Sequence, residues 1–271
     1  VGRFYGYKVI GMYKTADDFY QKNSKGEFLL DAAGNKVPTP RPADGDGNMY
    51  PIAPNSIWVG DYIYEDMNGD GKIDNNDRTF IGNPNPDFTF GLNNTITWKN
   101  FDFSFFINGS VGGDIYNYVR QGHTNTEKYG NMMKEVAGYA KVGLIDPNGS
   151  ATDINNVYVT NPDLVTAQRI SAAGQNQNDN NRVSSRFVED GSYLRLKSIS
   201  LTYNFPKKWL APLQIHGLSI YGNIQNLFTI TGYDGYDPEI GANGQSVLLQ
   251  NIDNYRYPSQ RIYTFGLKLA F

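Results

Sequence analysis

The chain has 271 residues, of which 14% are aromatic, and its 20 Tyr, 15 Phe and 29 Gly favour strands and turns over helices. No apolar run approaches the roughly 20 residues that a membrane-spanning helix requires, so a soluble β protein or a membrane barrel remains. The formal net charge of -3, without a Lys/Arg cluster, argues against nucleic acid as a partner, and the absence of cysteine excludes disulfides and thiolate metal sites.

The first predicted element is a weak strand candidate, Tyr5 to Tyr13, followed by a long connection over residues 14–85. Within this connection, residues 66–77 match the calcium-loop pattern D-x-[DN]-x-[DN]-G. Gly71 can take the sharp turn of such a loop while Ile73 packs inward. Six residues supply oxygens that can converge on one hard cation: Asp66, Asn68, Asp70, Lys72 through its carbonyl, Asp74 and Asp77.

The residue types in this loop do not decide which cation it would bind. Asp77 replaces the usual bidentate Glu, and its shorter reach keeps Mg²⁺ as an alternative to Ca²⁺. The flanking segments look extended rather than helical, which predicts a structural clip and not a sensor that opens a groove. The competing interpretation is a solvated turn rich in Asp, Asn and Gly.

Five further segments alternate large apolar residues with small or polar ones, as strands with two different faces do. Asp87 to Lys99 alternates with Asn94 as the one misfit, and Phe101 to Asn108 follows after a tight turn, with Phe106 out of phase. The remaining segments are 199–205, 218–225 and 260–271. One face of each suits lipid and the other a wet lumen, so the alternation predicts transmembrane barrel strands.

The connections alternate strictly in length. Residues 14–85, 112–191 and 232–259 form long connections, whereas 99–100 and 206–216 are short. Outer-membrane barrels have long external loops and short periplasmic turns, so this order predicts that Phe271 lies at the periplasmic end. An aromatic girdle is expected at that end, from Trp98, Phe101, Phe205 and Trp209.

The weak first candidate brings the count to about six strands, each near the length that spans a membrane. Six strands cannot close, because the smallest membrane barrels have about 8, so we expect an all-β, antiparallel transmembrane portion of a larger barrel. Arg195 and Lys197 are expected to line the lumen, to pair with loop carboxylates, or to form ordinary surface ion pairs. His123 and His216 lack a nearby nucleophile or acid, so no enzymatic role is predicted.

A soluble or surface-attached β module, stabilised by calcium and used for carbohydrate binding or adhesion, is the rival interpretation. It predicts that the Phe88/Phe90/Leu92 face and the Phe265/Leu267/Leu269 face pack on each other in one core.

Several motifs, spread in order over almost the whole chain, resemble one known family. They are Gly60-Asp61 through Asp77-Arg78, Ile81 to Phe88 with Gly91, Tyr193 to Tyr203, Asn226 to Thr231, Gly235 to Glu239, and Tyr263 to Leu267. Together they resemble the C-terminal region of SusC/RagA-type TonB-dependent outer-membrane transporters of the Bacteroidetes.

This resemblance implies a 22-stranded barrel with a plug in its lumen, of which residues 1–271 would be the C-terminal part. It also implies location in the outer membrane, contact with lipid, a SusD-like surface lipoprotein as a lid, and TonB acting through N-terminal parts that this chain lacks. Substrates of the family are large nutrients, glycans or peptides. The residues that would contact a substrate are not identified by the sequence.

Overall fold

The computed structural model describes residues 2–128, 130–240 and 249–271, which divide into two compact units. The sheet unit consists of Asn83–Asn117 and Glu189–Phe271, with Gly2. The loop unit consists of Arg3–Gly82 and Tyr118–Val188. Each unit is therefore assembled from stretches that lie far apart in the sequence.

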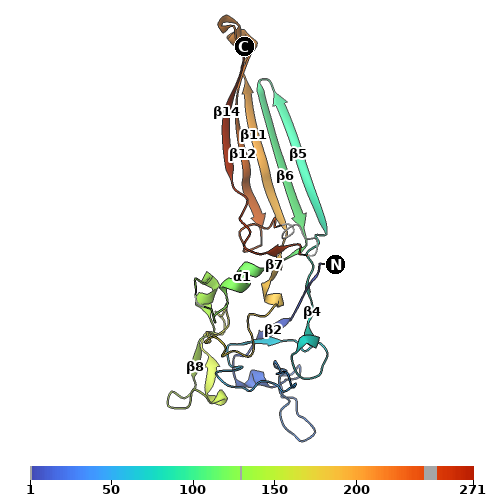
Figure 1. Ribbon diagram of the computed structural model, residues 1–271, viewed down its shortest axis with the longest axis vertical. Coiled ribbons are helices and arrows are strands. Elements are labelled where there is room, and N and C mark those ends of the chain that lie inside the picture. Colours follow the sequence, from blue (N-terminus) through green and yellow to red (C-terminus); the bar gives the residue numbers. More distant parts are fainter. Residues whose placement is uncertain (1, 129, 241–248) are drawn as a thin grey trace. The chain divides into compact units, whose positions relative to one another are not determined.

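The sheet unit contains one antiparallel sheet of five long strands among the described residues. Its order is β14-β12-β11-β6-β5. The strands are β5 (Phe88–Trp98), β6 (Phe101–Val111), β11 (Tyr193–Asn204), β12 (Gly217–Thr231) and β14 (Ile262–Ala270). Each of them overlaps one of the five segments in which apolar and polar residues alternate, so the alternation identified the strands correctly. Their bounds differ, because β11 begins before its segment and β12 ends after its own. Figure 1 shows these strands side by side.

The register places most large apolar residues of the five strands on one face, called the apolar face below; Phe106, Tyr221 and Ile262 lie on the other face. Leu92 lies opposite Ile107, Leu201 lies opposite Phe103, and Ile220 lies opposite Leu267. The opposite, polar face carries Thr, Ser, Asn and charged side chains: Thr89, Asn93, Thr95, Thr97, Asp102, Ser104, Asn108, Arg195, Ser198, Ser200, Asn223, Gln225, Thr229, Thr264 and Lys268. The sheet thus separates the two classes of side chain as a barrel wall requires.

Short and long connections leave opposite ends of this sheet. The short ones are 99–100 and the link after β11, which contains α2 (Lys207–Leu210) and η6 (Ala211–Leu213). The long connections contain β7 (Asp114–Asn117), β10 (Val188–Asp190) and β13 (Ile252–Asp253), which form a small sheet in the order β10-β7-β13. Residues 241–248 of the connection between β12 and β14 lie outside the described residues.

The loop unit consists of short elements around cores of its own. Its strand pairs are β1 (Phe4–Gly6) with β4 (Thr79–Gly82), β2 (Val9–Met12) with β3 (Tyr62–Tyr64), and β8 (Val142–Leu144) with β9 (Val157–Val159). The helices are η1 (Ala16–Phe19), η2 (Asn75–Asp77), α1 (Tyr118–His123), η3 (Lys134–Gly138), η4 (Ile154–Asn156) and η5 (Ser185–Phe187). In the part of the chain that the structure describes, no helix combines the length and apolarity needed to cross a bilayer.

A hydrophobic core of the loop unit joins residues from its two stretches. It buries Tyr13, Phe19, Ile57, Trp58 and Val59 from the first stretch with Ala140, Val157 and Val159 from the second. The Tyr13 and Phe19 rings stack with centroids 4.2 Å apart. The connections predicted as separate loops, 14–85 and 112–191, therefore contribute most of their residues to one folded unit.

The prediction that Tyr5 to Tyr13 forms a barrel strand is wrong. These residues form β1 and β2 of the loop unit and do not join the five-stranded sheet. The segment carries large apolar side chains on both of its faces, of which Tyr13 is buried while Tyr5 and Ile10 are exposed. Its two short strands pair with β4 and β3 of the same unit, so tertiary partners decide its place. The described sheet consequently has five strands rather than about six.

Candidate functional site

The apolar face of the sheet lies open along its length. Phe265 is 82% exposed and Leu267 is 63% exposed, while Phe88, Leu92 and Ile96 are each more than half exposed. The Phe88/Phe90/Leu92 and Phe265/Leu267/Leu269 groups lie on the same face of the two edge strands and do not pack on each other, contrary to the soluble-module interpretation. An apolar surface of this extent is a contact surface for lipid or protein.

Aromatic rings form a contacting row at the end of the sheet where the short connections lie. The centroid distances are 6.4 Å for Trp98–Phe101, 4.7 Å for Phe101–Tyr203, 5.0 Å for Tyr203–Phe205 and 6.5 Å for Phe205–Trp209. The sequence predicted that four of these five residues gather at one end, and the structure confirms this. Amphipathic rings at one level are typical of a membrane interface.

The predicted cation loop, residues 66–77, is a compact turn of the loop unit. Gly69 and Gly71 have φ angles of 76° and 85°, which favour glycine. Asp66 accepts hydrogen bonds from the amides of both glycines, at 2.7 and 2.8 Å. Ile73 is 2% exposed and packs with Tyr62 and Tyr64, as the sequence predicted for the inward-pointing residue.

Asp77 closes the same loop from its far end. One carboxylate oxygen accepts from the Met67 amide at 2.9 Å and the other from the Asp74 amide at 2.7 Å. Burial raises the pKa of the Asp77 carboxyl above its usual range, against the opposing effect of these two amides. Asp77 therefore joins the two ends of the turn, a role beyond the one expected of a cation ligand.

The remaining predicted ligands are engaged within the turn. Asn68 Oδ1 accepts from the Asp70 amide at 3.0 Å, Asp70 Oδ1 accepts from the Lys72 amide at 3.2 Å, and Asp74 Oδ1 accepts from Asn76 at 2.7 Å. Within the described ranges, no group of three or more Asp, Glu, His or Cys side chains could hold a metal ion as placed. The all-oxygen donor set suits a hard divalent cation, but binding requires the carboxylates to turn inward.

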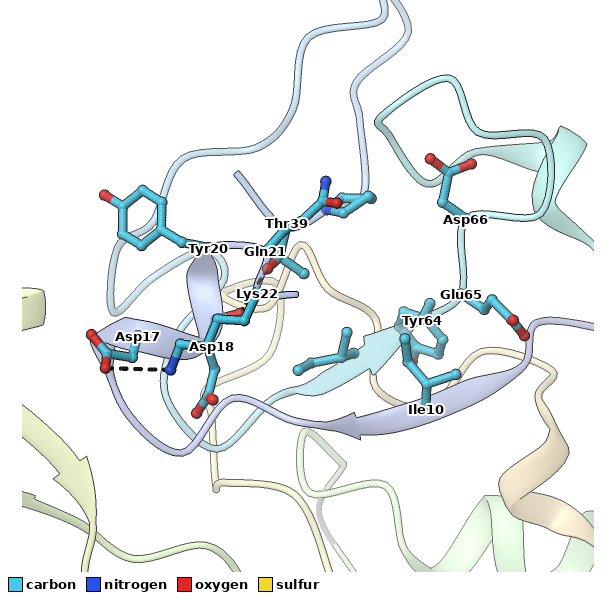
Figure 2. Close-up of a pocket in the computed structure, with 12 residues that line it drawn as sticks. Ile10, Asp17, Asp18, Tyr20, Gln21, Lys22, Thr39, Tyr64, Glu65 and Asp66 are labelled. Carbon is cyan, nitrogen blue, oxygen red and sulfur yellow. Dashed lines mark hydrogen bonds and ion pairs between the residues drawn. The ribbon is translucent and has the colours of Figure 1, made fainter. Parts of the chain in front are cut away.

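A pocket of about 480 Å³ lies beside the cation loop, and Figure 2 shows its lining. Acidic groups line it: Asp17, Asp18, Glu65 and Asp66. They have partners already, because Asp17 pairs with Lys22 at 3.4 Å, Glu65 pairs with Lys8 at 2.7 Å, and Asp18 accepts from the Thr15 amide. Two of the four carboxylates are therefore paired with lysines, and Asp18 and Asp66 are hydrogen-bonded to backbone amides.

A buried ion pair that sequence reasoning missed lies in the loop unit. Arg169 Nε donates to Asp61 Oδ1 at 2.8 Å and Nη2 to Asp61 Oδ2 at 3.2 Å, and the Asp61 side chain is fully buried. Asn180 Nδ2 donates to Asp61 Oδ1 at 2.8 Å, and the Trp58 amide donates to Oδ2. Asp61 is separated from Arg169 by 108 positions and from Asn180 by 119. No local pattern in the sequence predicts these contacts.

A second charged cluster lies on the sheet unit. Arg195 contacts Asp237 at 2.5 Å and Glu239 at 2.8 Å, and Lys197 contacts Glu239 at 2.5 Å. Of the alternatives open from the sequence, pairing with loop carboxylates is the one observed. Arg195 lies on the polar face, opposite Asn108 and Thr229.

Comparison with known proteins gives a consistent result. No protein-family model matches the chain. Its sequence is 30% identical over its whole length to TonB-dependent receptor P3 and 31% identical to TonB-dependent receptor P39, both of Formosa agariphila. It is also 28% identical, over 88% of its length, to the TonB-dependent receptor SusC of Bacteroides thetaiotaomicron.

The chain corresponds to a barrel portion of a SusC/RagA-type TonB-dependent receptor. It spans about a quarter or less of these relatives, covering 22% of P3, 25% of P39 and 22% of SusC. The fold of this receptor portion is similar to the RagAB peptide importer in its open-open state, with a TM-score of 0.57 and 20% identity, covering 99% of this chain and 22% of that one. These relatives are named as receptors and not as enzymes, in keeping with the non-enzymatic role that the sequence predicts.

Proposed function

We propose that this receptor portion forms part of the wall and the external vestibule of an outer-membrane transporter that imports large nutrients, glycans or peptides, with energy delivered through TonB. The observation that carries the proposal is the two-faced sheet. Its apolar face suits lipid and its polar face suits a wet lumen. Among the described residues, the outer edges of β5 and β14 pair with no further strand, so both could pair with further barrel strands. The long connections would then face outward and the aromatic row inward, toward the periplasm.

The membrane assignment is tested with two neighbouring residues of β11 in the full-length receptor. Leu201 lies on the apolar face and Ser200 on the polar face. Leu201→Arg should lower the stability of the folded barrel by about 2–4 kcal/mol, because a charge then faces lipid, whereas Ser200→Arg should be tolerated. Folded receptor is measured by heat-modifiable gel mobility in outer-membrane fractions. Equal behaviour of the two variants would refute the membrane assignment.

A SusD-like surface lipoprotein is the proposed partner at the outer end, and its support is the resemblance to SusC and RagA. Purification of the full receptor from native outer membranes, followed by identification of the proteins bound to it, tests this partner. Uptake of labelled oligosaccharides and oligopeptides, with and without TonB, tests the activity and separates the two substrate classes. Uptake that does not depend on TonB would contradict the proposed energy source.

We also propose that residues 66–77 bind Ca²⁺, with Mg²⁺ as the weaker alternative, through the oxygens of Asp66, Asn68, Asp70, Lys72, Asp74 and Asp77. The donor chemistry supports this, as do the two glycines of the turn and the inward Ile73. Because the carboxylates must be drawn together, binding and ordering of the loop should be one event.

Trypsin provides the test, since Lys72 lies inside the loop. Ca²⁺ should slow cleavage after Lys72 in the full receptor, and chelator should restore it. Asp70→Ala should remove the Ca²⁺ effect, while the control Asp46→Ala, in the exposed turn at 44–48, should keep it. Cleavage that is insensitive to Ca²⁺ and Mg²⁺ in the unmodified receptor would eliminate the proposed site.

A further inference from the structure

Two described pieces of the connection between β12 and β14, residues 232–240 and 249–261, are held onto the polar face of the sheet by charge. These two pieces are called the third connection here. Arg195 of β11 is 3% exposed and donates to Thr229 Oγ1 at 2.7 Å, to Asp237 and to Glu239. Lys197 adds a second contact to Glu239. Two cations on the sheet thus meet two carboxylates on the connection.

Asp237 also organises the connection itself. Its Oδ2 accepts from the Ser259 amide at 2.8 Å, and its Oδ1 accepts from the Glu239 amide at 3.0 Å. Beyond this, Tyr233 donates to Asp253 at 2.6 Å. The two described ends of the connection are therefore joined to each other, and Arg195 docks this joined piece on the sheet.

A cavity of about 290 Å³ separates the connection from the sheet beside this contact. Thr89, Ser110 and Tyr193 line it from the sheet, and Pro238, Glu239 and Ile240 line it from the connection. The connection consequently lies over the polar face rather than extending away from it. In a closed barrel that face borders the lumen.

The contact between Arg195 and the third connection is an ion pair rather than apolar packing, and this difference has a physical consequence. A buried ion pair adds little to stability compared with well-packed apolar groups, but it fixes one arrangement, because removing either partner leaves an uncompensated charge. We propose that Arg195 is a positioning residue for transport: it holds the third connection over the lumen-facing side of the sheet and so limits the width of the passage at that end. The effect on passage rests on the proposed transport function, whereas the position of the connection does not.

The experiment compares full-length receptor variants in outer-membrane vesicles. Arg195→Gln should raise the rate of trypsin cleavage after Arg256, in the third connection, by about tenfold or more. The connection would detach from the sheet more often and expose this site to the protease. Arg195→Lys should restore much of the protection. Lys268→Gln is the matched control, since Lys268 lies on the same face and forms no ion pair among the described residues. If Arg195→Gln does not assemble, the double variant Asp237→Asn/Glu239→Gln replaces it, because it removes both carboxylates that Arg195 contacts.

A second measurement separates a positioning role from a merely structural one. Uptake of a size series of the accepted substrate should extend to larger members in Arg195→Gln and return to the original limit in Arg195→Lys. Unchanged cleavage after Arg256 in folded Arg195→Gln would overturn the docking role, and raised cleavage with an unchanged size limit would overturn the role in passage. Failure of uptake in the unmodified receptor would count against the transport proposal, while the cleavage result would still decide the position.

Discussion

The Asp237 carboxylate is a group whose charge state the structure strongly constrains. Its burial favours the neutral acid, yet donation from Arg195 and from Ser259 outweighs burial and lowers the pKa of Asp237 to about 2. A carboxyl whose pKa is lower in the folded state contributes stability above its ordinary pKa and loses this contribution as the pH falls through the folded value.

This sign gives a prediction for acid conditions. The contribution of Asp237, about 2 kcal/mol, should be complete above about pH 5 and be lost progressively as the pH falls through about 2. Hydrogen exchange of the Ser259 amide in the full receptor measures it, and protection should decrease over that window. Asp237→Asn should lack the pH-dependent component. Protection that is equal in both proteins at every pH would contradict the assigned bonds.

At the scale of the strands, aromatic rings cover glycines on neighbouring strands. The Phe265 ring lies over Gly222 and the Phe90 ring over Gly109 on the apolar face, while Tyr221 lies over Gly266 on the polar face. The same packing explains Phe106, which was out of phase in the sequence, because its ring lies over Gly91. A ring placed over a glycine covers backbone that would otherwise lack a packing partner.

Gly109 provides the element-scale prediction. A Cβ there would lie 2.7 Å from the Tyr193 carbonyl oxygen and 2.5 Å from the Phe90 ring. Gly109→Ala should therefore destabilise the barrel by about 1–3 kcal/mol, through strain in a packed region. Gly217→Ala is the control, since its Cβ would meet only Ala270 at an ordinary 3.7 Å. Urea unfolding in lipid vesicles should rank the two; equal midpoints would contradict the assigned packing.

At the scale of the whole chain, each unit has its own stabilising interactions. The sheet unit depends on strand pairing, whereas the loop unit has a hydrophobic core and the buried pair between Arg169 and Asp61. Arg169 also donates to the carbonyls of Pro54 and Ser56, at 2.8 and 3.0 Å. One guanidinium therefore fixes three positions of the first stretch from the second.

Loss of this guanidinium should affect one unit selectively. Arg169→Ala leaves the Asp61 charge buried without its partner, so the loop unit should lose about 3–5 kcal/mol. Protease cleavage within 3–82 and 118–188 should increase while the barrel keeps its heat-modifiable mobility. Lys8→Ala, which removes the exposed pair with Glu65, should change stability by less than about 1 kcal/mol. Loss of barrel mobility in Arg169→Ala would show that the units do not respond separately.

The strands were predictable from the sequence because a period of two is a direct mark of a sheet with unlike faces. The same logic found the hairpin at Lys99-Asn100 and the aromatic row. It failed for Tyr5 to Tyr13, where both faces carry apolar groups and tertiary packing decides the partner. The cation loop was visible as a motif, but the pairing of Arg169 with Asp61 depends on contacts across more than 100 positions, which no local pattern encodes.

The loop unit is interleaved with the sheet unit along the chain, since β5 and β6 separate its two stretches in sequence. If recombination between related receptors exchanged only residues 3–82, Arg169 of one receptor would face the surroundings of Asp61 from another. The first stretch and the second should consequently be inherited as a matched set. Engineers who graft surface loops between such receptors would need to transfer both stretches together.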